Sequence, residues 1–146
     1  MTVADFTPAK WPVLAATNEW ATEPRLDVFY VFEGCAGNNH CISVRIGEGF
    51  DLSCRQNGGF AALDTNNGHL TGDSFVRFNS KCGDNAFTDR DRRALACEEL
   101  GHIMGLDHGG DPNDTCMASG PIDQLHHHPR PHDFSMLHDF IYDHND

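Results

Sequence analysis

The chain has 146 residues, 39% of them hydrophobic, which is enough for one compact domain with its own core and leaves little room for a second. Ten Lys and Arg stand against 22 Asp and Glu, giving a net charge of -12 with neutral His, and this balance argues against nucleic acid or an anionic membrane as a partner. We therefore predict a single domain over residues 1–146 that binds a peptide, a small molecule or a cationic partner.

The first predicted elements are a helix and a strand. Residues 12–23, PVLAATNEWATE, carry apolar residues at helical spacing behind a proline that suits the first turn, and Pro24 ends this helix. Residues 26–33, LDVFYVFE, form a short run of β-branched and aromatic residues, which predicts a buried strand.

Several shorter strands are predicted next. Residues 41–47, CISVRIG, and 49–54, GFDLSC, look like the two strands of a hairpin. A further strand, a turn and one or two more strands follow, and FVRFN at 75–79 alternates as an edge or half-buried strand does. The segment DTNNG at 64–68 slightly resembles a calcium loop, but it lacks the glycine and distal glutamate of an EF-hand, so a hairpin turn is the preferred interpretation.

The clearest helix begins after Thr88, which forms a capping-box pattern with Asp91, and should end at Gly105. Residues 109–131 show no sustained period and are predicted to be a loop, and residues 132–144 form a last helix. Because the strands precede the long helix, the expected fold class is α+β, with this helix packed under the sheet.

The six cysteines contain no CxxC pair and favour disulfides, and hence an oxidising compartment, over buried free thiols. The start, MTVADFTPAK, lacks the regions of a signal peptide, so a secreted protein would have lost its signal from this sequence. No stretch is long enough to span a bilayer, and we expect no membrane partner. The histidine-rich segment HHHPRPH at 126–132 offers a second metal site or a solvated loop, and its prolines favour the loop.

The segment CEELGHIMGLDH at 97–108 carries the chemistry. Residues three or four apart lie within about 60° of one another around a helix, so Glu98, Glu99 and His102 share a face. The glycine after them lets the chain leave the helix sharply, which makes His108 available. This spacing assigns Glu98, His102 and His108 as zinc ligands.

Two histidines and one glutamate form an accepted catalytic zinc set, and three protein ligands leave one position open for water. Glu99 would then act as the general base. Two alternatives stay open: Asp107 could replace His108 as a ligand, and EExxH also occurs on ordinary solvated helices that bind no metal.

EELGHIMGLDH differs by one letter from the motif HExxHxxGxxH, and DTCM follows at 114–117. Together these segments resemble the active-site helix, glycine turn and Met-turn of the metzincin metallopeptidases, particularly a secreted, matrixin-like group in which the first histidine is replaced. The similarity runs over most of the chain from about Trp11, but only residues 97–117 are diagnostic. The resemblance implies a zincin catalytic domain, with a mixed twisted sheet, an N-terminal helix, a long active-site helix, a Met-turn and a C-terminal helix.

The resemblance further implies a secreted endopeptidase with one Zn²⁺, with Glu98, His102 and His108 as ligands, Glu99 as base and Met117 in the Met-turn. We expect a peptide or protein substrate, a monomer, and no nucleic acid. Glu98 departs from the family pattern, in which this ligand is a histidine. An anionic ligand makes zinc-bound water less acidic, so we expect a weaker enzyme. The alternative function is therefore a catalytically weak or inactive binding or inhibitory protein on the same scaffold.

The disulfide pairs that complete this expectation are Cys97 with Cys116, which would join the helix to the Met-turn, Cys41 with Cys54 across the predicted hairpin, and Cys35 with Cys82.

Overall fold

A computed structural model describes residues 1–34, 40–48, 50, 54, 57–66, 69–71, 73–82 and 86–141. Within these ranges the fold is mixed α and β, which agrees with the predicted α+β class. A five-stranded mixed sheet has the order β2-β1-β3-β7-β4, and β5 and β6 form a separate two-stranded sheet. The strands are β1 (Thr2–Asp5), β2 (Phe29–Phe32), β3 (Cys41–Gly47), β4 (Gly59–Ala62), β5 (Thr65–Asn66), β6 (His69–Leu70) and β7 (Phe75–Asn79).

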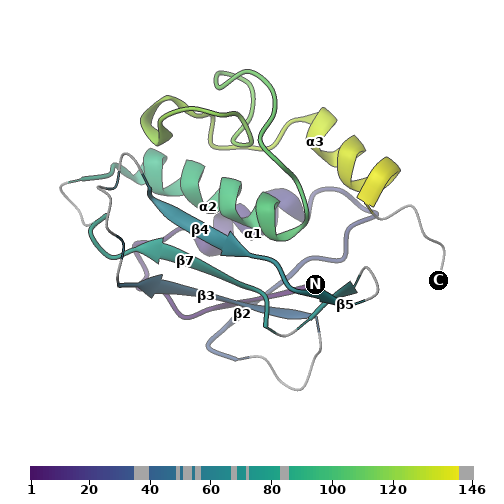
Figure 1. Cartoon of the computed structure of the whole chain (residues 1–146), viewed down its shortest axis with the longest axis horizontal. Helices are drawn as coiled ribbons and strands as arrows, with labels where there is room; N and C mark the ends of the chain where they lie inside the picture. Colours follow the sequence, from purple (N-terminus) through teal and green to yellow (C-terminus); the bar gives the residue numbers. More distant parts are fainter. Residues whose placement is uncertain are drawn as a thin grey trace.

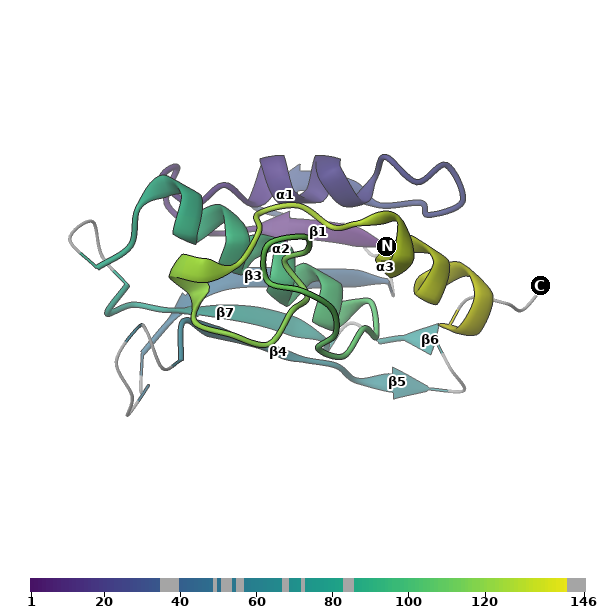
Figure 2. The same cartoon turned by 90° about the horizontal axis from the view of Figure 1, so that it is seen from above.

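The helices lie on one side of the five-stranded sheet (Figure 1). They are α1 (Val13–Trp20), α2 (Asp89–Ile103) and α3 (Pro131–Met136), with a 3-10 turn at Ile122–Gln124 and a π-helical turn at Leu137–Ile141 after α3. Seen from above, α1 and α2 lie side by side over the sheet, and the chain between α2 and α3 crosses over α2 (Figure 2). Helix α2 is therefore covered by the sheet below and by this segment above.

The sequence analysis missed one strand, and this omission made the prediction for a second strand wrong. A strand at the very start of the chain, β1, was not predicted, yet it pairs in parallel with both β2 and β3 and occupies the interior of the sheet. Helix α1 supplies the crossover that parallel pairing of β1 and β2 requires. Because β1 takes the interior position, β2 becomes an edge strand with Phe29 and Phe32 59% and 63% exposed, rather than the buried strand that was expected.

The predicted hairpin at 41–54 is also wrong in its described part. Strand β3 pairs in parallel with β1 and β7, and neither neighbour follows it directly in the chain. Most of the second predicted strand lies outside the described residues. Strand β7, predicted to be an edge or half-buried strand, lies inside the sheet because β4 folds back antiparallel to it and takes the edge.

The remaining secondary-structure predictions largely agree with the structure. The capping box forms at the start of α2, where Thr88 Oγ1 accepts from Asp91 N and Asp91 Oδ2 accepts from Thr88 N. Strands β5 and β6 pair antiparallel on either side of the turn predicted at residues 67 and 68, which are themselves outside the described residues. Of the last predicted helix, residues 142–144 lie outside the described part. No helix in the described part of the chain is long and apolar enough to cross a bilayer.

One predicted disulfide is confirmed and two are wrong. Cys97 bonds to Cys116, whereas Cys54 bonds to Cys82. Cys41 begins β3, and Cys82 follows the parallel strand β7, so these residues lie at opposite ends of the sheet. A strand rises about 3.3 Å per residue, and the seven residues of β3 therefore hold Cys41 far from the end where Cys54 meets Cys82. The other residue of the third predicted pair, Cys35, lies outside the described residues.

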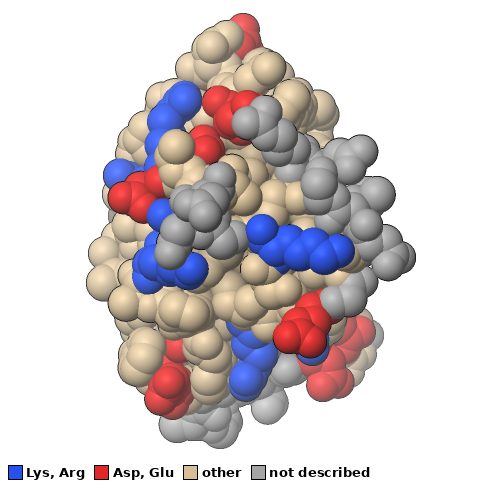
Figure 3. All heavy atoms as spheres, turned by 90° about the vertical axis from the view of Figure 1, so that its left-hand side faces the viewer, with Lys and Arg blue, Asp and Glu red and all other residues tan. Residues whose placement is uncertain are grey.

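Charge is interspersed on the surface at the end of the molecule shown in Figure 3. Lys and Arg side chains lie there between uncharged and acidic ones, so this face carries no continuous basic surface.

Deep in the core, Trp11 stacks on Phe78 with ring centroids 4.3 Å apart, which joins the segment before α1 to the centre of the sheet.

Helix α2 packs closely against the segment that carries Met117. A Cβ atom added at Gly101 would overlap Met117 Sδ and would approach Trp20 to 3.0 Å. Both neighbours are fully buried and have no room to move aside. Only glycine therefore allows this contact between the helix and the segment above it.

We predict that Gly101→Ala destabilises the protein. Alanine is more favourable than glycine inside a helix by about 1 kcal/mol, but overpacking a core costs about 1–3 kcal/mol, so the free energy of unfolding should fall overall. Chemical denaturation measures this change. Gly34→Ala is the control, because an added Cβ there meets nothing within 4 Å. A Gly101→Ala protein more stable than the wild type would contradict the packing.

Candidate metal centre

The turn after α2 brings the third predicted ligand back to the helix. Helix α2 ends in a Schellman motif, in which Leu106 N donates to Gly101 O at 3.1 Å and Gly105 N donates to His102 O at 3.0 Å. Gly105 has a φ of 102°, a left-handed conformation that a side chain would strain. The chain therefore reverses direction at Gly105, as predicted, and His108 comes to lie beside the helix.

The three predicted ligands converge. His108 Nε2 lies 2.9 Å from Glu98 Oε1 and 3.2 Å from His102 Nε2, and one donor atom from each residue falls within 4.8 Å of the others. In tetrahedral zinc, ligand atoms about 2.0–2.1 Å from the ion are about 3.4 Å from each other. The spacing of the three side chains therefore fits a metal ion. In the described part of the chain, this is the one group of His, Cys, Asp or Glu residues with such geometry.

The hydrogen-bond partners leave the right atoms free. His102 Nδ1 lies 2.8 Å from the carbonyl oxygen of Leu106, which can only accept, so Nδ1 carries the hydrogen and Nε2 keeps its lone pair. Asp107 Oδ1 accepts from the backbone N–H of His108 at 2.7 Å. The group that could hold a metal contains His108 and not Asp107, which agrees with His108 as the predicted third ligand.

The carboxyl group of Glu99 lies in the same pocket but against the sheet. A Cβ built on Gly59 of β4 would be 3.0 Å from Glu99 Oε1, so this carboxyl group touches the edge strand. A cavity of about 410 Å³ opens here, between β4, the outer side of α2 and the segment at 119–122, and all four residues Glu98, Glu99, His102 and His108 line it.

Burial shifts the pKa values of three residues that line this pocket. Removal from water raises the pKa of Glu99 to about 8, and the negative charge of Glu98 adds to the shift. Burial also raises the pKa of Glu98, against the opposing effect of His108, and lowers that of His102. Two buried carboxyl groups beside two imidazoles form a donor set that a divalent cation would stabilise.

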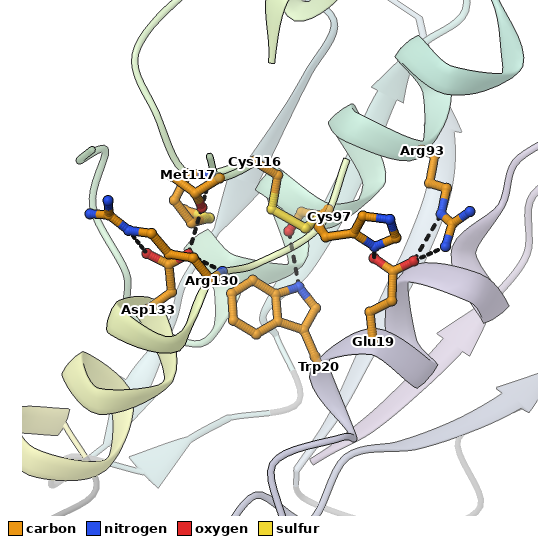
Figure 4. Close-up of a disulfide and its surroundings, with 10 residues drawn as sticks. Glu19, Trp20, Arg93, Cys97, Cys116, Met117, Arg130 and Asp133 are labelled. Carbon is orange, nitrogen blue, oxygen red and sulfur yellow. Dashed lines mark hydrogen bonds and ion pairs between the residues drawn. A yellow bond between two sulfur atoms is a disulfide. The ribbon is translucent and has the colours of Figure 1, made fainter. Parts of the chain in front are cut away.

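The predicted Met-turn residue, Met117, packs against α2 and is held from three directions (Figure 4). Met117 N donates to Thr115 Oγ1 at 3.1 Å, and Thr115 Oγ1 donates to the buried carboxylate of Asp133 at 2.5 Å. Gly109 N donates to Met117 O at 2.7 Å, which ties this segment to the residue after His108. The Met117 side chain is 1% exposed and packs against α2 at Gly101, next to His102.

Three further links join α2 to the elements around it. The Cys97–Cys116 disulfide connects the residue before Glu98 to the residue before Met117. Trp20 Nε1 donates to Cys97 O at 3.1 Å from α1, and Glu19 of α1 pairs with Arg93 of α2 (Figure 4). The roles of Trp20, Thr115 and Asp133 were not predicted, because no spacing in the sequence marks them.

The histidine-rich segment was predicted to be a solvated loop, and this prediction is wrong. Its first three histidines are half-buried and pack against one another. The rings of His126, His127 and His128 lie with centroids 4.0–5.3 Å apart, and His128 Nδ1 is 3.0 Å from Glu19 Oε2. His126 N donates to Pro112 O and Cys116 N donates to His128 O, so this segment is bonded to the one that carries Met117. The rings of His126 and His127 stack, and the ring of His128 is tilted against both. These three residues do not form a group with metal-binding geometry.

Comparison with protein-family models finds no match to the chain, and a search of curated proteins finds no significant match.

Removing the Cys97–Cys116 disulfide should lower both stability and metal affinity. For a loop of this size, with a sequence separation of 19 between the cysteines, the loss of stability should be about 3 kcal/mol. The double variant Cys97→Ala/Cys116→Ala is compared with Cys54→Ala/Cys82→Ala, whose separation of 28 gives a similar loss without a covalent link to α2. Zinc competition titrations should show weaker binding in the first variant only. Equal zinc affinities in both variants would contradict a role for the first disulfide at the site.

Without metal, Glu99 should make the protein less stable as the pH rises. A carboxyl group whose pKa is raised by folding takes up a proton when the chain folds, so its contribution to stability falls between the ordinary pKa of about 4.5 and the folded pKa of about 8. Urea unfolding in a chelating buffer at several pH values in this interval measures the slope. Glu99→Gln should reduce the slope, and equal slopes in the two proteins would contradict the buried, protonated Glu99.

Proposed function

We propose that the protein is a secreted zinc metalloendopeptidase of the metzincin type. The observation that carries this proposal is the convergence of Glu98, His102 and His108 in a pocket that also contains the carboxyl group of Glu99. Disulfide bonds support an extracellular site of action, since such bonds persist in oxidising compartments. A peptide or protein is the proposed substrate.

The proposed roles follow from where each group lies. Zinc, when bound, supplies a Lewis acid that makes a water molecule acidic near neutral pH and polarises the carbonyl group of the substrate. Glu98, His102 and His108 would hold it, and the Leu106 carbonyl keeps His102 in the tautomer that presents Nε2. Glu99 accepts the proton of the attacking water and returns it to the departing amine, since its carboxyl group lines the same pocket.

The edge strand supports an extended substrate. Strand β4 ends the five-stranded sheet, and in the described part of the chain its outer side pairs with no other strand. A peptide in extended conformation can add to such an edge through backbone hydrogen bonds. It would then run past Gly59, directly beside Glu99, with room for a side chain between Leu95 and Ile122 at the apolar part of the pocket.

One observation favours the alternative, a non-catalytic binding or inhibitory protein on the same scaffold. His108 Nε2 lies within hydrogen-bonding distance of both Glu98 and His102, so a proton on this nitrogen satisfies the three side chains without a metal ion. Glu98 also brings a negative charge to the ligand set, and metal binding would have to displace that proton. Metal content distinguishes the two functions directly.

The test combines elemental analysis with a cleavage assay. Protein purified without added metal should contain about one zinc per chain and should cleave an unstructured protein such as casein. Glu99→Gln should keep its zinc and lose activity by about 10²–10⁴-fold, whereas Glu98→Gln should lose both. Asp107→Asn is the matched control and should retain both, because Asp107 bonds to the backbone beside the site.

Two results would contradict the proposal in different ways. Activity that survives in Glu99→Gln would remove Glu99 as the base. A wild-type protein with an intact fold and no bound zinc, even after incubation with the ion, would favour the non-catalytic alternative. Under the enzymatic proposal, Glu98→His should tighten zinc binding. A buried carboxyl group with a raised pKa must lose its proton before it binds the metal, and a neutral imidazole need not.

A further inference from the structure

A second pocket lies at the opposite edge of the sheet, between α1 and β2. It has a volume of about 510 Å³, and its walls include Asp5, Thr7, Trp11, Leu14, Tyr30 and Phe32. We call it the Asp5 pocket. The sheet order places β2 and β4 at opposite edges, so the Asp5 pocket is separate from the metal centre. Asp5 is the one charged residue among those that line it.

The carboxylate of Asp5 is buried without a cation. Asp5 is only 5% exposed, and its side chain accepts hydrogen bonds from neutral donors alone. Oδ1 accepts from Thr7 N at 2.8 Å and from Thr7 Oγ1 at 2.7 Å, and Oδ2 accepts from Tyr30 OH at 3.0 Å. Buried aspartates are usually paired with a positive charge, and no described residue provides one here.

The two carboxylate oxygens have different local roles. Oδ1 closes a turn onto Thr7, two residues along the chain, and this turn ends β1. Oδ2 has a single donor, the Tyr30 hydroxyl, although a carboxylate oxygen can accept two. Burial, with the hydrogen bond to Asp5, raises the pKa of Tyr30 to about 12, so the phenol stays a neutral donor. Oδ2 thus keeps capacity for one further donor.

The rim of the Asp5 pocket is aromatic. Phe32 is 63% exposed on the edge strand, an unusual exposure for a phenylalanine, and Tyr30 stands two residues away on the same face of β2. The faces of aromatic rings attract cations within about 6 Å. Leu14 adds an exposed apolar side chain from α1, which suits the aliphatic stem of a long basic side chain.

We propose that the Asp5 pocket binds the basic side chain, lysine or arginine, of a polypeptide partner. The ammonium or guanidinium group donates to Asp5 Oδ2 and lies against Phe32 and Tyr30, and the methylene stem packs on Leu14. The net charge of -12 attracts such a partner from a distance. This pocket does not depend on the metal centre, and the inference stands whether or not the protein cleaves peptides.

The test is a titration of the full chain with three small probes, in which the NMR signals of the Trp11 and Tyr30 side chains report binding. The probes are N-acetyl-lysine methylamide, its arginine counterpart, and N-acetyl-norleucine methylamide, which keeps the stem of lysine and lacks the charge. The lysine and arginine probes should bind in the millimolar range, and norleucine at least about tenfold more weakly, by the usual strength of a hydrogen bond between charged groups. Equal binding of norleucine and lysine would overturn the proposal.

Variants assign the binding to named residues. Asp5→Asn keeps an acceptor for Thr7 and removes the charge, and it should weaken lysine binding by about tenfold or more. Phe32→Ala should weaken it by about two- to fivefold, as expected for one exposed ring beside a cation. Phe29→Ala is the matched control, because Phe29 is equally exposed on β2 but lies on the opposite face of the strand and outside the pocket. It should bind lysine as the wild type does.

The outcomes separate the proposal from its competitors. If Asp5→Asn unfolds the chain, the surface pair Phe32→Ala and Phe29→Ala still decides, since neither ring is part of the core. Equal losses in these two variants would overturn the assignment to the Asp5 pocket. Tetramethylammonium, a cation without N–H groups, should bind more weakly than the lysine probe. Equal or tighter binding would show a site for free quaternary cations and would overturn the assignment to basic side chains.

Discussion

The candidate metal centre depends on one close approach, that of α2 to the segment carrying Met117. Gly101 has no side chain, so Met117 lies directly against the helix axis beneath His102. The Cys97–Cys116 bond holds the two segments together one residue away from Glu98 and Met117. Because these links contact α2 on a different side from the pocket, Glu98, Glu99 and His102 can line the pocket while the helix keeps its place.

Three buried acidic residues line pockets without a Lys or Arg partner among the described residues. Glu98 and Glu99 lie buried side by side on α2, and Asp5 lies buried at the end of β1 with neutral donors alone. Burying an anion is costly unless a cation or several donors offset it. The two pockets therefore have a feature in common: buried acidic side chains line each of them, and a bound cation would stabilise these side chains. A metal ion suits the first, where imidazoles converge, and a basic side chain suits the second, where aromatic rings do.

The helices and the strands were not equally predictable. Helix α2 carries its own signals, a capping box at Thr88 and a left-handed glycine at Gly105, and both act over a few residues. Strand pairing depends on residues far apart in the chain, and TVAD at the start is too short to show a pattern. Once β1 had been missed, the position of β2 in the sheet and the neighbours of β3 were wrong as well, and with them two disulfide pairs.

By itself, the sequence determined the local part of the site. A spacing of four residues places Glu98 and His102 on one face of any helix, and a glycine three residues before His108 allows the chain to return, because both effects arise within a single helical turn and its cap. Only the tertiary structure decided the rest: that His108 and not Asp107 meets the helix, that Thr115 and Asp133 hold Met117, that Glu99 is buried against Gly59, and that Asp5 faces a pocket. These contacts join segments that no local pattern relates, since burial is a property of the whole packed chain.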